Sequence, residues 1–386
     1  MKINEWMVTS SDTLPIKKSN AARVLFFSDV HLLHKGTPTS VIIFNLMLLI
    51  EYVVKTELDA IYILGDLFDE RDTLENADLI SAIGFLNDLL ELCKKKNIAL
   101  RVLEGTPKHD RKQSKVVVEL NKKFNIDLKY FDDITVFKDE KINKVVGLVP
   151  DEYRDDASET TRLFKNLMKS SGYNKLDIAG MHGLFKFQIP HVESKANFDE
   201  RVWERMVKLG ICIGHDHKVK QRGIIRILGS TDCLNHGEVG KKGVTVVDFY
   251  DDYAEGWFVL NPHPCMYLTV EGDNKTDEEI IRGVEVAAKK IKDAPHSKHG
   301  RLRVTYPHDS DIRVTLRSLS ERYGIDIKPQ RLVNKDRIVK INQALMEKVD
   351  EGIHLDKETI SRILLERIES QSPMASDIIK EIEDRL

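Results

Sequence analysis

The chain has 386 residues, of which 41% are hydrophobic and 31% charged, a composition that excludes a largely disordered protein and predicts two or three domains. Its net charge of −3 shows none of the basic excess that is typical of many nucleic-acid binders. Any binding of DNA phosphates must therefore be local, metal-based or supplied by a partner. No apolar run is long enough to span a bilayer, the first residues lack a signal-peptide pattern, and the 4 cysteines are scattered without a CxxC pair. We therefore expect a cytoplasmic protein in a reducing compartment, with no membrane partner.

Between residues 20 and 250, short apolar runs rich in β-branched residues are followed by Gly, Asp or His, and such runs predict buried strands. The clearest amphipathic helices, at 40–55 and 76–96, lie between them. Strands that alternate with helices indicate an α/β layered core. The predicted strands cover residues 24–27, 60–64, 99–103, 145–149, 176–179, 211–213, 224–228 and 244–249.

After about residue 260 the pattern changes to that of a small α+β unit. Thr276 and Glu279 form a capping-box pattern that opens a helix. The remaining elements predicted here are strands at 266–270, 302–306 and 325–327 and a helix at 312–323. From residue 355 two amphipathic segments, separated by Pro373, need a surface to bury against; they either pack on their own domain or dock a partner chain.

Acidic and imidazole side chains follow five of the predicted strands, at the point where each strand ends. Each motif alone is weak, but ligands bind beyond the carboxyl ends of strands in open α/β sheets, so the series predicts one shared site. Carboxylates and imidazoles without thiolates suit Mn²⁺, Fe or Zn²⁺ rather than Ca²⁺. One shared carboxylate can hold two cations about 3.5–4 Å apart, which clamp a phosphate ester. The series comprises Asp29-Val30-His31, Gly65-Asp66-Leu67-Phe68-Asp69, Gly105-Thr106-Pro107-Lys108-His109-Asp110, Met181-His182-Gly183 and Gly214-His215-Asp216-His217.

The order of these motifs resembles that of the calcineurin-like metallophosphoesterases, whose pattern is DxH, GDxxD, GNHD or GNHE, a single His, and then GHxH. The resemblance implies an α/β fold, a sandwich of two β-sheets flanked by helices. It also implies a role for most of the acidic and imidazole side chains in these motifs. Asp29, His31 and His217 would hold one metal, Asp66 would bridge, His182 and His215 would hold the second metal, and His109, oriented by Asp110, would protonate the leaving oxygen.

One motif departs from the family pattern. GTPKHD is two residues longer than GNHD and lacks the Asn that normally binds the second metal. Thr106, a backbone carbonyl or water replaces that ligand, or His109 itself moves into the coordination shell; the sequence leaves these alternatives open.

A second segment narrows the resemblance. Residues 228–238, LGSTDCLNHGE, followed by Lys241-Lys242-Gly243 and a strand, are similar to the segment after GHxH in SbcD-like nuclease subunits, including those of phages. The resemblance implies an Mn²⁺-dependent DNA exonuclease and endonuclease with two divalent metal ions, acting with an SbcC-like coiled-coil ATPase in DNA repair or recombination. Homodimers within a hetero-oligomer are usual in that family. The implied domains are a nuclease domain at 1–260, a capping domain at 261–340 and a C-terminal helical partner-binding segment at 341–386.

Two alternatives remain at this stage. The same chemistry serves phosphodiesterases and phosphatases of small esters, because a fold does not decide its substrate. The lost Asn also leaves room for a non-catalytic scaffold with a degenerate metal site.

Overall fold

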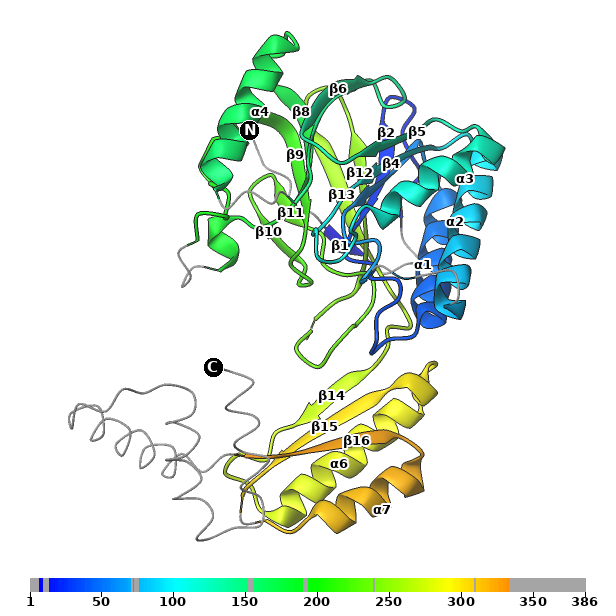
Figure 1. The fold of residues 1–386 in the computed structure, drawn as a ribbon, viewed down its shortest axis with the longest axis vertical. Coiled ribbons are helices and arrows are strands. Elements are labelled where there is room, and N and C mark those ends of the chain that lie inside the picture. The colour runs from blue at the N-terminus through cyan, green and yellow to red at the C-terminus, as the bar shows by residue number, and fades with distance from the viewer. Residues whose placement is uncertain are drawn as a thin grey trace, which may run out of the picture. The chain divides into compact units, whose positions relative to one another are not determined.

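The computed structural model describes residues 7–9, 14–70, 72, 76–151, 156–189, 194–238, 240–308 and 310–332. The chain divides into two compact units, Met1–Leu268 with Lys289–Arg301, and Thr269–Ala288 with Leu302–Leu386 (Figure 1). The predicted domain bounds at 260 and 340 stay predictions, and the partner-binding segment 341–386 lies outside the described residues.

The first unit contains a sheet of seven strands in the order β1-β13-β12-β2-β3-β4-β5. Strands β2 to β5 run parallel to one another, whereas β12 runs antiparallel to β2 and to β13. Five consecutive buried residues form each of β3 and β4, with the predicted bounds. The strands are β1 (Met7–Thr9), β2 (Ala22–Phe27), β3 (Ala60–Leu64), β4 (Ala99–Leu103), β5 (Leu128–Phe131), β12 (Gly243–Phe249) and β13 (Ala254–Leu260).

A second sheet of six strands has the order β10-β11-β9-β8-β7-β6. Its inner strands β7, β8, β9 and β11 are parallel, and β6 and β10 close the edges antiparallel. The strands are β6 (Thr135–Asp139), β7 (Lys144–Val149), β8 (Leu176–His182), β9 (Val207–Gly214), β10 (Lys220–Arg222) and β11 (Ile225–Ile227).

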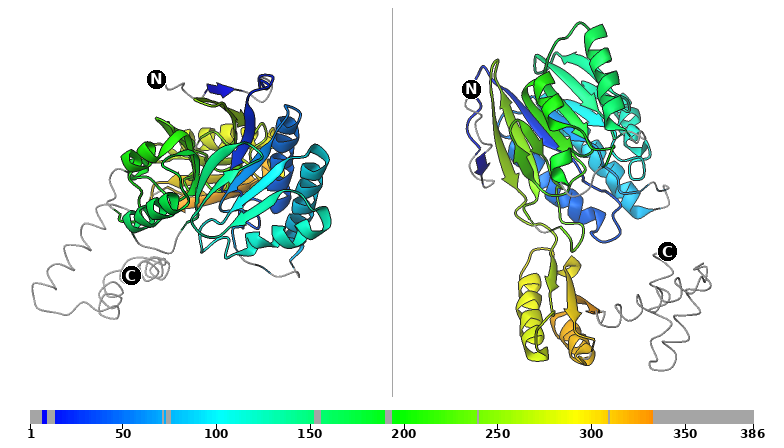
Figure 2. Two further views of the ribbon diagram at one scale, coloured as in Figure 1. Left: turned by 90° about the horizontal axis from the view of Figure 1, so that it is seen from above. Right: turned by 90° about the vertical axis from the view of Figure 1, so that its left-hand side faces the viewer.

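The two sheets pack face to face and helices cover their outer faces (Figures 1 and 2). Side chains from both sheets, among them Phe26, Tyr62 and Ile178, form the core between them. Apolar side chains of α1 (Thr39–Val54), α2 (Ala77–Lys96) and α3 (Val116–Phe124) pack on the first sheet. Those of α4 (Ala157–Ser170) and α5 (Glu200–Met206) pack on the second. The predicted α/β sandwich of two sheets flanked by helices is confirmed.

The carboxyl ends of the parallel strands from both sheets meet at one edge of the sandwich. The last residue of β8, His182, donates from Nδ1 to the carbonyl of Leu64 at the end of β3, 2.7 Å away. Gly65 permits this approach, because a Cβ there would lie 2.3 Å from the Nδ1 of His182 and its φ is +83°. This edge is where the sequence motifs converge.

A smaller sheet, β14-β15-β16, follows the sandwich in the chain. The predicted capping box is present: the backbone N–H of Thr276 donates to Glu279 Oε2 at 2.9 Å, and that of Glu279 donates to Thr276 Oγ1 at 3.3 Å. The elements are β14 (Tyr267–Val270), α6 (Asp277–Lys292), β15 (Arg301–Tyr306), α7 (Arg313–Tyr323) and β16 (Asp326–Arg331). Among the helices of the described residues, none combines the length and hydropathy that crossing a bilayer requires.

Candidate metal centre

Four of the predicted site residues have backbones in the left-handed region. The φ angles are +52° for Asp29, +51° for His31, +50° for Asp66 and +94° for His215. Each such non-glycine conformation costs about 1–3 kcal/mol and persists only where the surroundings hold it. Here the loops after β2 and β3 hold each other, since the N–H groups of Val30 and His31 both donate to the Asp66 carbonyl at 2.9 and 3.0 Å. Strain concentrated in these loops is typical of a functional site.

Asp29, His31 and His217 form what we name the first donor cluster, with one ligand atom of each within 4.8 Å of the others. The Nε2 atoms of His31 and His217 lie 3.1 Å apart. The Nε2 of His217 lies 3.6 Å from Asp29 Oδ1. His31 and His217 are 186 positions apart in the chain. They meet because β2 and β9, which precede them in two different sheets, end at the same edge of the sandwich.

The hydrogen bonds of the two imidazoles decide which nitrogen faces the cluster. His31 Nδ1 lies 2.9 Å from Asp69 Oδ1, and His217 Nδ1 lies 2.8 Å from Glu238 Oε1. A carboxylate only accepts, so both Nδ1 atoms carry the hydrogen. The two Nε2 lone pairs then point at each other, and a proton or a cation must lie between them. A carboxylate–histidine pair of this kind is how proteins orient metal-binding imidazoles.

Asp66, His182 and His215 form the second donor cluster, again with ligand atoms within 4.8 Å of one another. His182 is 1% exposed, and its Nδ1–H donates a hydrogen bond to the Leu64 carbonyl, which can only accept. Its Nε2 lone pair therefore faces Asp66 Oδ1 at 3.3 Å. Burial lowers the pKa of His182, but the carboxylate of Asp66 outweighs burial and holds that pKa well above its usual value. The Nε2 of His182 is therefore the atom that a proton or a metal ion would bind.

Asp66 faces both clusters with its two oxygens. Oδ1 lies 3.3 Å from His182 Nε2, and Oδ2 lies 3.6 Å from His31 Nε2. Burial raises the pKa of Asp66, but the adjacent imidazoles of His182 and His31 outweigh it and hold the pKa far below the usual range. A carboxylate that stays ionised and faces two sets of imidazoles fits a bridging ligand for two divalent cations.

His109 and Asp110 differ from the expected arrangement. His109 Nδ1 donates to the backbone carbonyl of Asp69 at 2.8 Å, and its ring lies against that of His31 with centroids 4.8 Å apart. The carboxylate of Asp110 instead accepts the N–H groups of Phe68 at 2.9 Å and Gly105 at 2.8 Å. Asp110 therefore ties the loops after β3 and β4 together, and Asp69 orients His109.

The cause lies in the longer motif. The N–H groups of His109 and Asp110 both donate to the Thr106 carbonyl, at 2.9 and 3.0 Å, so the inserted residues form a turn. Adjacent side chains on that turn point in different directions. The role of His109 as an acid stays a prediction.

Three carboxylates that were not predicted as site residues lie at the centre. Asp69 and Glu238 orient His31 and His217, and Asp151 Oδ2 lies 3.8 Å from His215 Nδ1. Asp69 closes the GDLFD motif, and Glu238 belongs to the GE pair of the segment after GHxH, so two of the three lie in motifs already noted. Asp151 follows β7 without any motif that distinguishes it.

Glu238 is held by a network of its own, which includes an ion pair with Lys242 Nζ at 2.7 Å. Lys242 also donates to Ser230 Oγ at 2.6 Å and to the carbonyl of His217 at 3.1 Å. Burial raises the pKa of Glu238, but His217 and Lys242 outweigh it and lower that pKa to about 2. Ser230, Glu238 and Lys242 thus form the support of His217.

Glu238→Gln is expected to weaken the binding of one divalent cation by about 10–100-fold, because His217 loses the charged acceptor that fixes its ring. Equilibrium dialysis against Mn²⁺ measures the change. Glu119→Gln, which alters an exposed ion pair with Lys122, serves as the control and should bind as the unchanged protein does. Equal affinities of the Glu238 variant and the control would contradict this orienting role.

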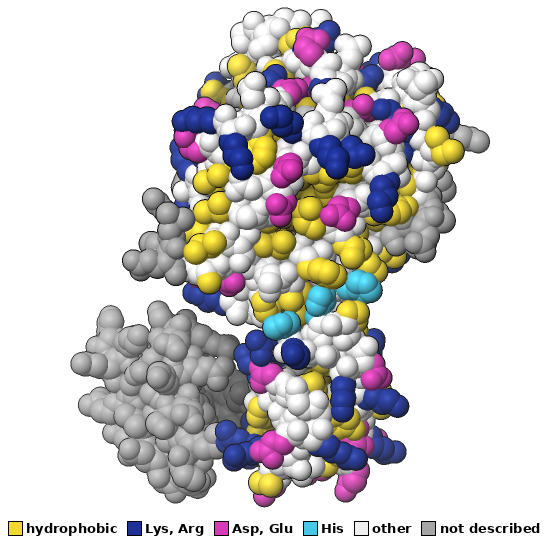
Figure 3. Space-filling model, turned by 90° about the vertical axis from the view of Figure 1, so that its right-hand side faces the viewer, with side chains coloured by type: hydrophobic (Ala, Val, Ile, Leu, Met, Phe, Trp, Pro, Cys, Tyr) yellow, Lys and Arg dark blue, Asp and Glu magenta, His cyan; other side chains and the backbone are white. Residues whose placement is uncertain are grey.

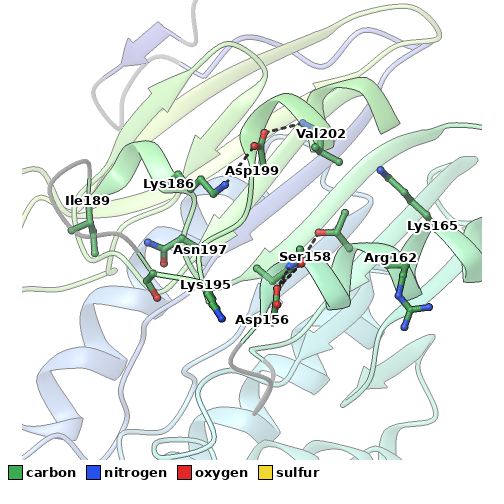
Figure 4. A pocket seen from close by; sticks show the side chains of 13 residues that line it. Asp156, Ser158, Arg162, Lys165, Lys186, Ile189, Lys195, Asn197, Asp199 and Val202 are labelled. Atoms are coloured by element: carbon green, nitrogen blue, oxygen red, sulfur yellow. Dashed lines mark hydrogen bonds and ion pairs between the residues drawn. The ribbon is translucent and has the colours of Figure 1, made fainter.

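A cavity of about 850 Å³ opens beside the second sheet (Figure 4). One wall is the first turns of α4, and the other is the chain between β8 and α5. The wall between β8 and α5 starts close to the centre in the sequence, since Lys186 follows His182 by four residues, and Gln188 Nε2 donates to Asp216 Oδ2 at 3.4 Å. Four exposed basic side chains line the cavity, namely Arg162, Lys165, Lys186 and Lys195, against two acidic ones, Asp156 and Asp199.

No protein-family model matches the chain. No curated protein matches it either. Among solved structures, TT1561 of Thermus thermophilus is similar at 11% sequence identity and a TM-score of 0.40, covering 61% of this chain and 98% of that one. A second solved structure is similar at 10% identity and a TM-score of 0.38, with the same coverage. Both likenesses are too remote to carry an argument, so the function rests on the geometry of the site.

Proposed function

We propose that this chain is a metal-dependent phosphodiesterase that hydrolyses DNA. The observation that supports the proposal is the pair of donor clusters that Asp66 faces with its two oxygens, built from oxygen and nitrogen donors without a thiolate. Such donors suit Mn²⁺, Fe²⁺ or Zn²⁺, and we propose Mn²⁺. Two bound cations supply Lewis acidity toward a phosphodiester and a hydroxide near neutral pH.

The chain's own residues hold and orient the reacting groups. Asp69 and Glu238 fix the tautomers of His31 and His217, so that both Nε2 atoms face the site. The side chain of His109 is 34% exposed, and its Nδ1 is committed to Asp69, so its Nε2 is the atom that would pass a proton to the leaving oxygen.

The cavity beside the second sheet supports a polymeric substrate rather than a small ester. Its basic side chains lie on both walls, an arrangement that would suit the phosphate backbone of a polymer. Elsewhere, basic and acidic side chains are interspersed on the face shown in Figure 3. The net charge of −3 and a local basic cavity are therefore compatible.

The variant Arg162→Glu with Lys195→Glu tests this substrate class, because it reverses one charge on each wall of the cavity. We expect kcat/KM for a single-stranded oligonucleotide to fall roughly tenfold and its salt dependence to flatten by about 0.7 per lost phosphate contact. Hydrolysis of a nitrophenyl phosphodiester, which does not reach the cavity, should not change. A control with Lys94→Glu and Lys96→Glu, at the far end of α2, carries the same change of net charge.

Each alternative has a distinct outcome in this experiment. Equal rates of the cavity variant and the α2 control on the oligonucleotide would favour a phosphodiesterase or phosphatase of small esters. Elemental analysis that finds no metal in the unchanged protein would favour the non-catalytic scaffold. The SbcC-like ATPase partner and the homodimer stay predictions from the resemblance, because the segment assigned to the partner lies outside the described residues.

A further inference from the structure

Thr106 lies where the family motif has its metal-binding Asn, and its hydroxyl oxygen contacts the second donor cluster. Oγ1 lies 3.2 Å from Asp66 Oδ2 and 3.2 Å from His215 Nδ1. It lies 3.3 Å from His182 Nε2. The hydroxyl is therefore nearly equidistant from one atom of every member of the cluster.

While His182 is neutral, hydrogen bonding alone does not account for these contacts. The Nε2 of His182 and the carboxylate of Asp66 can only accept in the neutral-imidazole state, because the single hydrogen of His182 lies on Nδ1. The Thr106 hydroxyl has one hydrogen, so it satisfies one of these two acceptors and leaves a lone pair facing the other. A cation in the middle of the cluster removes that repulsion.

The separations match those of ligands around one small ion. Four ligands at ~2.0–2.1 Å from a tetrahedral metal lie about 3.3–3.4 Å from one another. The three contacts of Thr106 Oγ1 are 3.2, 3.2 and 3.3 Å, and His182 Nε2 lies 3.3 Å from Asp66 Oδ1. These contacts have the spacing of neighbouring ligands in a coordination shell, with Asp66 facing Thr106 through Oδ2 and His182 through Oδ1.

The backbone holds Thr106 in this position. Its N–H donates to Asp66 Oδ1 at 2.6 Å. Gly105 permits the approach, because a Cβ there would lie 2.1 Å from the backbone nitrogen of Asp66. The loops after β3 and β4 are thereby pressed together at the point where the hydroxyl meets the cluster.

Two other candidates for the missing ligand already form hydrogen bonds with other groups. The Thr106 carbonyl accepts the N–H groups of both His109 and Asp110 within the turn. His109 holds the Asp69 carbonyl through Nδ1, and its ring lies beside His31 of the first donor cluster rather than beside the second. The Thr106 side chain, by contrast, turns its hydroxyl oxygen toward the second donor cluster.

We infer that the Thr106 hydroxyl is the fourth ligand of the second metal site, which thus has two imidazole nitrogens, a carboxylate oxygen and a neutral hydroxyl. The inference rests on the two metal sites of the proposed function but not on the identity of the substrate. The cation it suits is a borderline divalent ion such as Zn²⁺ or Mn²⁺. The hydroxyl takes the place of the family's carboxamide in the longer GTPKHD loop.

Metal binding to the full chain tests the inference without any assay of activity. Thr106→Val keeps the shape and the backbone N–H but removes the hydroxyl, whereas Thr106→Ser keeps the hydroxyl. We expect equilibrium dialysis against Zn²⁺ to show one of two ions bound at least about tenfold more weakly in the Val variant, and both bound normally in the Ser variant. Thr245→Val, which removes another buried hydroxyl within β12, is the matched control and should bind both ions normally.

The outcomes separate this inference from the proposed function. Two ions bound with unchanged affinity by Thr106→Val would overturn the ligand role and leave the two-metal site intact. No ion bound by the unchanged protein would overturn both. Should the Val variant not fold, a crystal of the unchanged chain grown with Zn²⁺ decides: an ion about 2.0–2.2 Å from Oγ1 supports the role, and an ion beyond about 3 Å overturns it.

Discussion

Asp66→Asn is expected to reduce hydrolysis on the order of 10³-fold or more while the fold persists. The substitution removes the charge that faces both donor clusters and turns an N–H₂ group toward His182 or His31. Metal ions contribute several kcal/mol of transition-state stabilisation, and each ~1.4 kcal/mol is a factor of ten in rate. Losing the shared ligand disturbs both ions at once, so this change should exceed that of any other single ligand.

The measurement is kcat/KM on a single-stranded oligonucleotide, together with the number of ions bound per chain. Asp216→Asn is the matched control. This residue stands between the ligands His215 and His217, yet its Oδ2 binds Lys220 Nζ at 2.9 Å and takes no part in either donor cluster. The control should keep most of its activity. An Asp66 variant with normal turnover and two bound ions would contradict the shared carboxylate.

Asp139→Ala is expected to destabilise the protein by about 3–5 kcal/mol, the usual cost of removing one partner from a buried ion pair. Asp139 ends β6 of the second sheet, and its carboxylate is bound in two places by Arg101 of β4 in the first, at 2.7 and 2.8 Å. The hydroxyl of Tyr62 donates to it at 2.6 Å. The substitution leaves a guanidinium and a phenol buried between the sheets without this acceptor, and it removes a tie between the two sheets that carry the site.

Urea unfolding measures the loss, with Asp127→Ala as the control. Asp127 binds the same guanidinium at 2.8 Å, but its side chain is 51% exposed, so its removal should cost about 0–1 kcal/mol. Similar losses in both variants would contradict the assignment of the stability to the buried pair.

The pH dependence of the Asp139 effect has a defined sign. Burial raises the pKa of Asp139, but hydrogen bonds from Arg101 and Tyr62 outweigh it and lower the pKa below its usual 3.8. A group with a depressed folded-state pKa stabilises the protein fully above its unfolded pKa and loses that contribution as pH falls through the folded value. The difference between the unchanged protein and Asp139→Ala should therefore be largest above about pH 5 and shrink in acid below about pH 4.

The sequence by itself determined the chemistry of the site and the central strands. The runs at 60–64 and 99–103 are confirmed with their bounds, because a strand buried on both faces is apolar throughout and needs no partner to be recognised. Asp66 and His215 each follow a glycine at the end of such a run. The edge strands β5 and β6 were not predicted, because they lack such a continuous apolar run and their half-exposed, charged residues resemble those of loops.

Tertiary structure alone decided which donors meet and what orients them. Asp29 receives the backbone N–H of His215 at 3.0 Å across 186 residues, a contact that depends on how two separate sheets pack. The turn within GTPKHD sends Asp110 toward backbone N–H groups and Thr106 toward the second donor cluster, and no local pattern shows this direction. The type of a residue limits which bonds its side chain can form. Its actual partners depend on how distant segments pack, and that packing produces no periodic pattern in the sequence.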